Sequence, residues 1–324
     1  MVRGTIFILS IIIALILAWV GAIACTIPPE KLSFVRVQFH GATGWIIGGT
    51  IYLSTDGGQH WGRIAKDCRE DDDFPPIELR KRVQFVDGSN GFLSLNRILE
   101  KTTDSGQTWI RTGLQPVHAL FFRDRLFGFI NDASGKMHRT RDGGESWEPI
   151  GQLHIGDVAF LPNKEIYAIK SKQLLRSADE GNSWVLVREL PKRPERIKVV
   201  DGDIWVVGQY GFCGFYNSSA ATFSDFSIPP ELFGPQGSLF DIASTQDSII
   251  AVGSAGAVFS SRNSSPTWEP VGQNIKEDLI SIDVAHDGTA FIVGGTPIPP
   301  VIFSPRNVVL ISKDCRTWQK LTLP

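Results

Sequence analysis

The sequence of 324 residues lacks the motifs that mark common catalytic and nucleotide-binding proteins. It contains no Gly-x-Ser-x-Gly nucleophile elbow, no phosphate-binding loop and no dinucleotide fingerprint. Its six histidines form neither an i,i+4 pair nor a cluster with cysteine, so no metal site and no cofactor are expected. The net charge of −2 provides no global positive field and gives no reason to expect a nucleic-acid partner.

Methionine and tyrosine are scarce, with two and four residues, whereas phenylalanine and tryptophan number 20 and nine. After the N-terminus no long polar segment shows the helical period. This composition fits an all-β protein with an aromatic core. The four cysteines, at positions 25, 68, 213 and 315, predict no disulfide, because loss or lipidation of Cys25 would leave an odd number of thiols.

One eight-residue pattern, Ser/Thr-x-Asp-x-Gly-x-Ser/Thr-Trp, recurs along the chain. Four copies begin at Ser54, Thr102, Thr140 and Ser177, and three degenerate copies span 216–223, 261–268 and 312–318. Their closing aromatic residues are 37 to 50 residues apart. A period of about 40–50 residues built from short strands is typical of propeller blades. We therefore predict an all-β fold, a seven-bladed β-propeller of four-stranded antiparallel blades, over residues 32–324.

Each copy of the pattern is expected to form the turn between the third and fourth strands of its blade. The glycine in fifth place supplies a positive φ, the aspartate accepts backbone N–H groups, and the tryptophan packs back over the blade. A catalytic carboxylate need not recur in every repeat, so we interpret these residues as structural. They are Asp56, Gly58, Trp61, Asp104, Gly106, Trp109, Asp142, Gly144, Trp147, Asp179, Gly181, Trp184, Asn263, Trp268, Asp314 and Trp318.

The pattern is that of the Asp-box, or BNR repeat, of sialidase-like propellers. A longer unit, made of residues 35–39, 44–49 and 51–58, resembles the blade of photosystem II stability/assembly-factor-like proteins. This resemblance covers about residues 32–324, with Gly44 and Trp45 opening the second strand as in that family. It implies a non-enzymatic scaffold that holds or helps to assemble a protein partner.

A sialidase-like glycoside hydrolase is the alternative that Asp-boxes allow. Such enzymes resemble six-bladed propellers with a Phe/Tyr-Arg-Ile-Pro motif, an arginine triad and a Tyr/Glu nucleophile pair. The motif is absent here, and none of the tyrosines, at positions 52, 167, 210 and 216, has an evident glutamate partner in the sequence. We therefore expect no catalytic residue.

Residues 1–25 are expected to lie outside the propeller as an export or anchor segment. Residues 6–25 are apolar except for Ser10 and Gly21, which is about the length that spans a bilayer. Residues 22–24 read Ala-Ile-Ala, a cleavage site, and Cys25 follows as a candidate lipidation site. An uncleaved anchor, a lipoprotein and a secreted protein remain open, and all three place the propeller outside the cytoplasm, at a bacterial periplasm or cell surface.

The long connections are expected on the face opposite the Asp-box turns, where binding loops would sit on a rigid scaffold. They are residues 66–81, 229–238 and 296–307. The residues proposed to face a protein partner are Phe74, Pro75, Phe233, Pro235, Pro299 and Val301. Basic residues of blades 2–5, among them Arg139, Arg141 and Arg196, are expected to be solvated; a basic sector across blades 2–4 for an acidic partner is the alternative.

Overall fold

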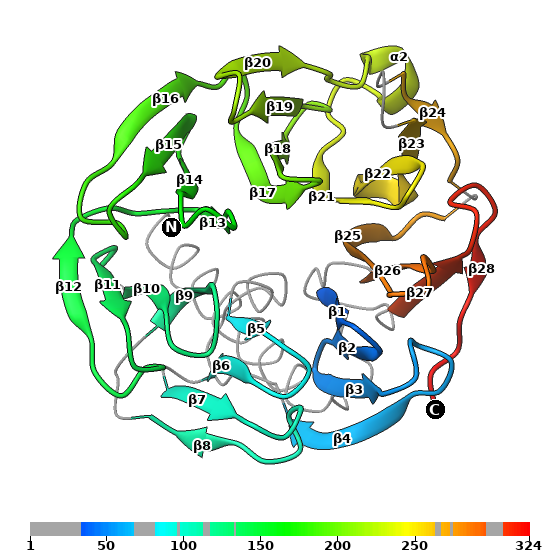
Figure 1. Cartoon of the computed structure of the whole chain (residues 1–324). Helices are drawn as coiled ribbons and strands as arrows, with labels where there is room; N and C mark the ends of the chain where they lie inside the picture. The colour runs from blue at the N-terminus through cyan, green and yellow to red at the C-terminus, as the bar shows by residue number, and fades with distance from the viewer. Residues whose placement is uncertain are drawn as a thin grey trace, which may run out of the picture.

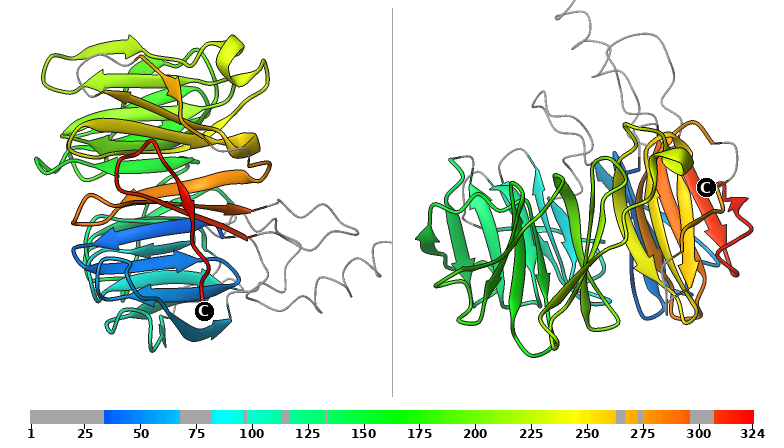
Figure 2. Two further views of the ribbon diagram at one scale, coloured as in Figure 1. Left: turned by 90° about the vertical axis from the view of Figure 1, so that its right-hand side faces the viewer. Right: turned by 90° about the horizontal axis from the view of Figure 1, so that it is seen from above.

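The computed structural model describes residues 34–67, 82–95, 98–112, 117–132, 134–262, 267–272, 275–295 and 307–324. In these ranges the chain forms seven four-stranded antiparallel sheets arranged as blades around a central axis (Figure 1). The predicted seven-bladed propeller is confirmed. Figure 2 shows the blades edge-on, with the connections between strands gathered on two opposite faces.

The first four blades are built from sixteen strands. Blade 1 contains β1 (Arg36–His40), β2 (Thr43–Ile47), β3 (Thr50–Ser54) and β4 (Gly62–Asp67). Blade 2 contains β5 (Val83–Phe85), β6 (Gly91–Leu95), β7 (Ile98–Thr102) and β8 (Ile110–Arg111). Blade 3 contains β9 (Val117–Phe122), β10 (Gly128–Asp132), β11 (Met137–Thr140) and β12 (Glu148–Gly151). Blade 4 contains β13 (Asp157–Phe160), β14 (Ile166–Lys170), β15 (Gln173–Ser177) and β16 (Val185–Glu189).

The last three blades include two short helical segments. Blade 5 contains β17 (Pro194–Val200), β18 (Asp203–Gly208), β19 (Cys213–Asn217) and β20 (Thr222–Asp225), followed by helix α2 (Pro230–Phe233). Blade 6 contains β21 (Leu239–Ser244), β22 (Ser248–Gly253), the 3-10 turn η3 (Ser254–Gly256), β23 (Val258–Arg262) and β24 (Glu269–Pro270). Blade 7 contains β25 (Asp278–Val284), β26 (Ala290–Gly295), β27 (Asn307–Ser312) and β28 (Gln319–Lys320).

Every blade is contiguous in sequence, with its first strand innermost and its fourth strand at the rim (Figure 1). Among the strands that the structure describes, blade 7 therefore closes on blade 1 without exchanging one. The joint is a hydrophobic cluster that includes Phe39, Phe291 and Val293, in which the rings of Phe39 and Phe291 lie 4.9 Å apart. Two polar contacts add to it: Asp283 Oδ2 accepts the backbone N–H of Phe39 at 2.8 Å, and Ser281 Oγ accepts that of Val37 at 3.4 Å.

A phenylalanine–glycine pair shapes the inner half of the first three blades. Phe39 lies opposite Gly44 in the β1–β2 register, and a Cβ added to Gly44 would lie only 2.2 Å from the Phe39 ring. The same pairing occurs at Phe85–Gly91 and at Phe122–Gly128. The phenylalanine ring occupies the space that a side chain would fill, so glycine is required at the start of these second strands.

Side chains of the inner strands hold the backbone of the next blade. The amide of Gln84 brackets Phe122, accepting its N–H at 2.8 Å and donating to its carbonyl at 2.7 Å. Asp157 Oδ2 accepts the N–H of Ile197 at 3.1 Å in the same manner. These bonds satisfy backbone groups that face the axis, where the described part of the chain provides no further strand to pair with them.

The side of the axis near blades 4 to 7 is crossed by a buried ion network. Arg196 Nη1 lies 3.5 Å from Asp157, and its Nε lies 3.5 Å from Asp241. Lys198 Nζ lies 3.2 Å from Asp241 and donates at 2.9 Å to the carbonyl of Ile282, which connects blade 5 to blade 7. The expectation that Arg196 is solvated is wrong, because its guanidinium neutralises carboxylates of two other blades.

The predicted N-terminal segment, residues 1–25 with Cys25, lies outside the described residues. Among the residues that are described, no helix combines the length and the apolarity needed to cross a bilayer.

Candidate functional site

The complete Asp-box turns share one hydrogen-bond pattern, shown here for the box of blade 2. Thr102 Oγ1 donates to Asp104 Oδ1 at 2.8 Å and accepts the N–H of Gly106 at 2.9 Å. Asp104 Oδ1 also accepts the N–H of Thr108 at 2.8 Å, while Oδ2 accepts the Thr108 hydroxyl at 2.5 Å. Trp109 Nε1 donates to the Gly106 carbonyl at 2.8 Å. Both carboxylate oxygens are thus committed to the turn.

The degenerate boxes keep only part of this pattern. Asp314 accepts the N–H groups of Arg316 and Thr317 at 2.9 and 2.8 Å, and Cys315 adopts the positive φ of 56° that glycine takes elsewhere. Trp268 Nε1 donates to the carbonyl of Phe226 in the preceding blade instead of to its own turn. Asn263 lies outside the described residues.

A second residue of each complete box also has positive φ, which the pattern did not reveal. The fourth position has φ of 76° at Gly57, 65° at Ser105, 72° at Gly143 and 57° at Glu180. In three boxes its N–H bonds to a carbonyl of the first turn of the same blade, for instance Ser105 to Ser89 at 2.8 Å. Sequence reasoning missed this position because serine and glutamate are rare in the left-handed region.

The box carboxylates are held ionised by these bonds. The hydroxyl and backbone N–H of Ser146 lower the pKa of Asp142 to about 2, and those of Ser183 do the same for Asp179. The backbone N–H and imidazole of His60 lower the pKa of Asp56 in the same direction. A carboxylate with a depressed pKa and no free oxygen is a poor general acid or base at neutral pH, which favours the structural interpretation.

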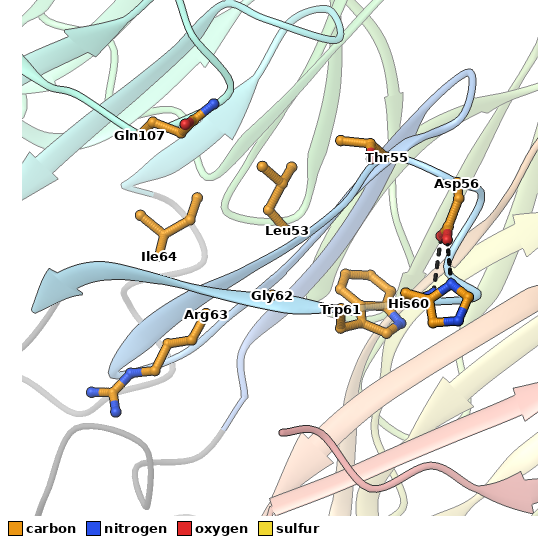
Figure 3. A pocket seen from close by; sticks show the side chains of 9 residues that line it. All are labelled: Leu53, Thr55, Asp56, His60, Trp61, Gly62, Arg63, Ile64 and Gln107. Atoms are coloured by element: carbon orange, nitrogen blue, oxygen red, sulfur yellow. Dashed lines mark hydrogen bonds and ion pairs between the residues drawn. The ribbon is translucent and has the colours of Figure 1, made fainter.

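A groove of about 590 Å³ lies between the boxes of blades 1 and 2 (Figure 3). Its floor includes Trp61, and Gln107 of the next box lies across from it. His60 replaces the hydroxyl residue found in the other complete boxes, and its Nδ1 lies 2.7 Å from Asp56 Oδ2. The pair resembles an acid–base dyad, yet Asp56 is the only carboxylate among the described residues that line the groove. These described residues therefore lack the two carboxyl groups that glycoside hydrolysis uses in most families.

One tyrosine does have a glutamate partner, which corrects the expectation from sequence. The Tyr167 hydroxyl donates to Glu165 Oε2 at 3.3 Å, and Arg176 bonds to the same carboxylate. Tyr167 is only 1% exposed, and burial followed by the charge of Glu165 raises the pKa of its hydroxyl. A buried phenol with a raised pKa cannot act as the nucleophile of a sialidase-like site.

The basic residues of blade 3 are engaged with carboxylates. Arg139 is buried, donates to the carbonyl of Glu180 at 2.7 Å and pairs with Glu148 at 2.8 Å. Arg141 lies 2.9 Å from Glu148 and 2.8 Å from Glu180. Arg139 therefore contradicts the expectation of a solvated position, whereas Arg141 is exposed as expected. Both arginines join blade 3 to blade 4 through Glu180.

Four of the residues proposed for the partner face, Phe74, Pro75, Pro299 and Val301, lie outside the described residues. Phe233 is partly buried and packs edge-on against Phe259 with the ring centroids 5.1 Å apart. It therefore caps blade 6 instead of projecting from the loop. Pro235 is exposed beside it.

Two large apolar side chains are exposed on this loop segment and the turn next to it. Tyr210, in the turn between β18 and β19, is 53% exposed, and Leu232 of α2 is 43% exposed. Lys192 Nζ lies 5.4 Å from the centroid of the Tyr210 ring. We call Lys192, Arg193, Tyr210 and Leu232 the blade 5–6 patch. Sequence reasoning missed it, because Tyr210 belongs to a short turn and no motif marks it.

Two of the four cysteines lie within the described residues. Cys213 and Cys315 are buried free thiols in different core clusters. Burial raises the pKa of Cys213, so this thiol is unreactive at neutral pH.

Comparison with known proteins relates the chain to assembly proteins. It is 25% identical over 287 residues to photosystem II assembly protein Ycf48 of Synechococcus sp. (strain JA-2-3B'a(2-13)), covering 82% of this chain and 84% of the relative. It is 25% identical to photosystem II assembly lipoprotein Ycf48 of Synechococcus sp. (strain CC9902) over 78% of this chain and 79% of the relative. No family model matches the sequence.

Solved structures share the fold at low sequence identity. Ycf48 bound to a D1 peptide aligns with a TM-score of 0.62 and 19% identity over 82% of this chain and 90% of that chain. The GH74 xyloglucanase of Xanthomonas campestris aligns with a TM-score of 0.63 and 14% identity over 84% of this chain and 53% of that chain. The chain is thus an Asp-box β-propeller that resembles the photosystem II stability/assembly-factor-like family along most of its length.

Proposed function

We propose that the protein is a non-enzymatic scaffold that binds a protein segment during assembly of a membrane protein complex. The observation that carries this proposal is the similarity to assembly proteins over about four-fifths of both chains. A similar propeller is seen with a D1 peptide bound, which supports a peptide segment of a membrane protein as the ligand class.

The geometry of the described residues agrees with a binding role more than with hydrolysis. The box carboxylates are engaged in their own turns, and the Asp56–His60 groove has one carboxylate where a glycosidase of the usual kind needs two. The GH74 likeness is one of fold alone, at 14% identity. Incubation with xyloglucan and with a fluorogenic sialoside tests this directly. Release of product above a heat-killed control would overturn the non-enzymatic assignment.

We also propose that residues 1–25 export the propeller and hold it at a membrane, and that residues 32–324 form the binding domain. The support is the apolar run that ends at Cys25 and the lipoprotein name of one relative. Mass spectrometry of the mature N-terminus decides among the three forms. A lipidated Cys25 is the expected product, and a chain that still begins at Met1 contradicts it.

Site-specific crosslinking in cells tests which face binds the partner. A photoreactive residue at position 74, 235 or 301 is expected to capture a subunit of a membrane complex, whereas one at 57 or 143 in the Asp-box turns is not. Equal capture from both faces would show that the loop face is not the binding face.

A further inference from the structure

We infer that the blade 5–6 patch anchors a protein segment that carries acidic residues next to a large apolar side chain. This inference rests on the proposed function, which supplies a protein partner but not its place or chemistry. The patch is formed by three connections on the face opposite the Asp-box turns: residues 190–193, the turn 209–212 and residues 229–238. Figure 1 shows α2 beside the outer strands of blades 5 and 6.

The apolar side chains of the patch differ in position from the other exposed ones. Among the described residues, the remaining large apolar side chains exposed to this degree are Ile110, Leu126, Val185 and Leu186. Three of these belong to fourth strands at the rim, and Leu126 lies in a first turn on the Asp-box face. Tyr210 and Leu232 are the two on the loop face, and the segments that carry them meet, because Gly211, next to Tyr210, lies against Phe233, next to Leu232.

Tyr210 is held outward by a strained backbone. Its φ is 58°, a conformation that bulky residues seldom adopt. Hydrogen bonds fix the chain on both sides of it: Gln209 N–H donates to the Arg193 carbonyl at 3.0 Å, and Gly211 N–H donates to the Gly237 carbonyl at 2.9 Å. The ring is therefore presented on a preorganised support, which reduces the entropy lost when a partner binds.

The charges of the patch determine what it fits. Lys192 and Arg193 are exposed, and neither forms an ion pair within the described part of the chain. Glu195 is occupied, since it accepts the side-chain amide of Gln209 at 3.3 Å. Glu231 lies on α2, next to Leu232 in the chain and on a different connection from the two cations. The acidic residues of the partner therefore lie over Lys192 and Arg193, and its apolar side chain lies between Tyr210 and Leu232.

Fluorescence polarisation with defined synthetic peptides and the full-length protein tests the inference. Three fluorescein-labelled twelve-residue pools are compared: acidic residues followed by Phe or Leu, the same peptides with Ser for the apolar residues, and the same peptides with Lys for the acidic residues. Only the first pool is expected to bind, and more weakly at 500 mM than at 50 mM salt because exposed charges are screened.

Two substitutions remove the two halves of the patch. Tyr210→Gly deletes the ring while suiting the positive φ, and Lys192→Glu reverses the charge. Each is expected to raise Kd about tenfold or more, as loss of an interface anchor does. Leu186→Ser, which removes an equally exposed apolar side chain from β16, is the matched control and is expected to leave Kd unchanged. Thermal melts verify that all three variants are folded.

The outcomes separate this inference from the proposed function. Binding of the first pool that is unaffected by both substitutions would place the site elsewhere and overturn the inference, while a peptide-binding scaffold would stand. Equal binding of the Lys pool would overturn the partner chemistry. Failure of all pools would overturn the inference as well, and the crosslinking experiment would then decide the proposed function by itself.

Discussion

Asp241 is the residue whose removal should disturb the propeller ring most. It is 2% exposed and accepts the N–H of Ile282 at 3.1 Å and the hydroxyl of Ser281 at 3.0 Å in the next blade. It also neutralises Lys198 and Arg196 of the preceding blade. Asp241→Ala therefore breaks the contacts of blade 6 with blade 5 and with blade 7 at once. It also leaves two largely buried cations, Arg196 and Lys198, without this carboxylate.

Removing one member of a buried ion pair costs about 3–5 kcal/mol, mainly because the remaining charge is left uncompensated. We expect the free energy of unfolding to fall by about that amount in Asp241→Ala. The double variant Asp241→Ala/Lys198→Met should cost less than the sum of the single changes, since it also removes one of the stranded charges.

Urea unfolding followed by tryptophan fluorescence measures both quantities. Asp247→Ala, which changes an exposed residue of the same blade in the β21–β22 turn, is the control and should alter stability by no more than about 0.5 kcal/mol. A loss below about 1 kcal/mol for Asp241→Ala, or strict additivity in the double variant, would refute the view that this ion network holds the ring.

The pH dependence follows from the same residue. Burial acts to raise the pKa of Asp241, but the charges of Lys198 and Arg196 and the N–H of Ile282 outweigh it and lower the pKa below its usual value. A depressed carboxyl pKa stabilises the fold above the unfolded value of about 3.9, and this stability is lost as the pH falls toward the folded value. Unfolding free energies measured from pH 6 to pH 3 should fall more steeply in the wild type than in Asp241→Asn.

Three further predictions concern the blades. Trp109→Ala should lower the free energy of unfolding by about 3–5 kcal/mol, and Phe223→Ala by less, because Phe223 closes a degenerate turn. A loss under about 1 kcal/mol for Trp109→Ala in urea unfolding would contradict the packing role of this tryptophan. Lys164→Gly should raise the free energy of unfolding by up to about 1 kcal/mol, because Lys164 has a φ of 69° that glycine adopts without strain. Lys172→Gly, at an exposed position without positive φ, is the control and should lower it. The reverse order of melting temperatures would exclude backbone strain as the cause. Asp142→Asn should reduce the fall in the free energy of unfolding between about pH 4 and pH 2, since the pKa of Asp142 in the folded protein is about 2. An unchanged dependence of this free energy on pH would show that the carboxylate contributes nothing to stability.

The blades were predictable because one local signal recurs. An Asp-box specifies its own turn through contacts within eight residues, as at Thr102–Asp104–Gly106, so its spacing counts the blades without tertiary information. The same spacing also predicted that each blade is one continuous stretch of sequence, because the first strand begins near residue 34 and the last box ends at Trp318.

The contacts between blades could not be predicted in this way. Arg196 and Asp241 are 45 residues apart and belong to no shared motif, so only the closed ring brings them together. Glu165 lies two residues before Tyr167, yet its partnership depends on the β13–β14 turn directing both side chains into one interface. Tyr210 was missed because a positive φ at a bulky residue is the exception that propensity rules exclude.

Within the described residues no strand is exchanged between blades, so the two ends of the described propeller meet at a junction like any other link between blades. Leu321 and Leu323 pack against the same cluster as Phe34, so the two ends of the described propeller already meet. Cutting the link between two blades and joining these ends would leave every strand pairing intact. The ring is thus a set of self-contained units threaded in a circle, and a gene could begin at any blade, or gain a whole blade by duplication, without having to repair a shared sheet.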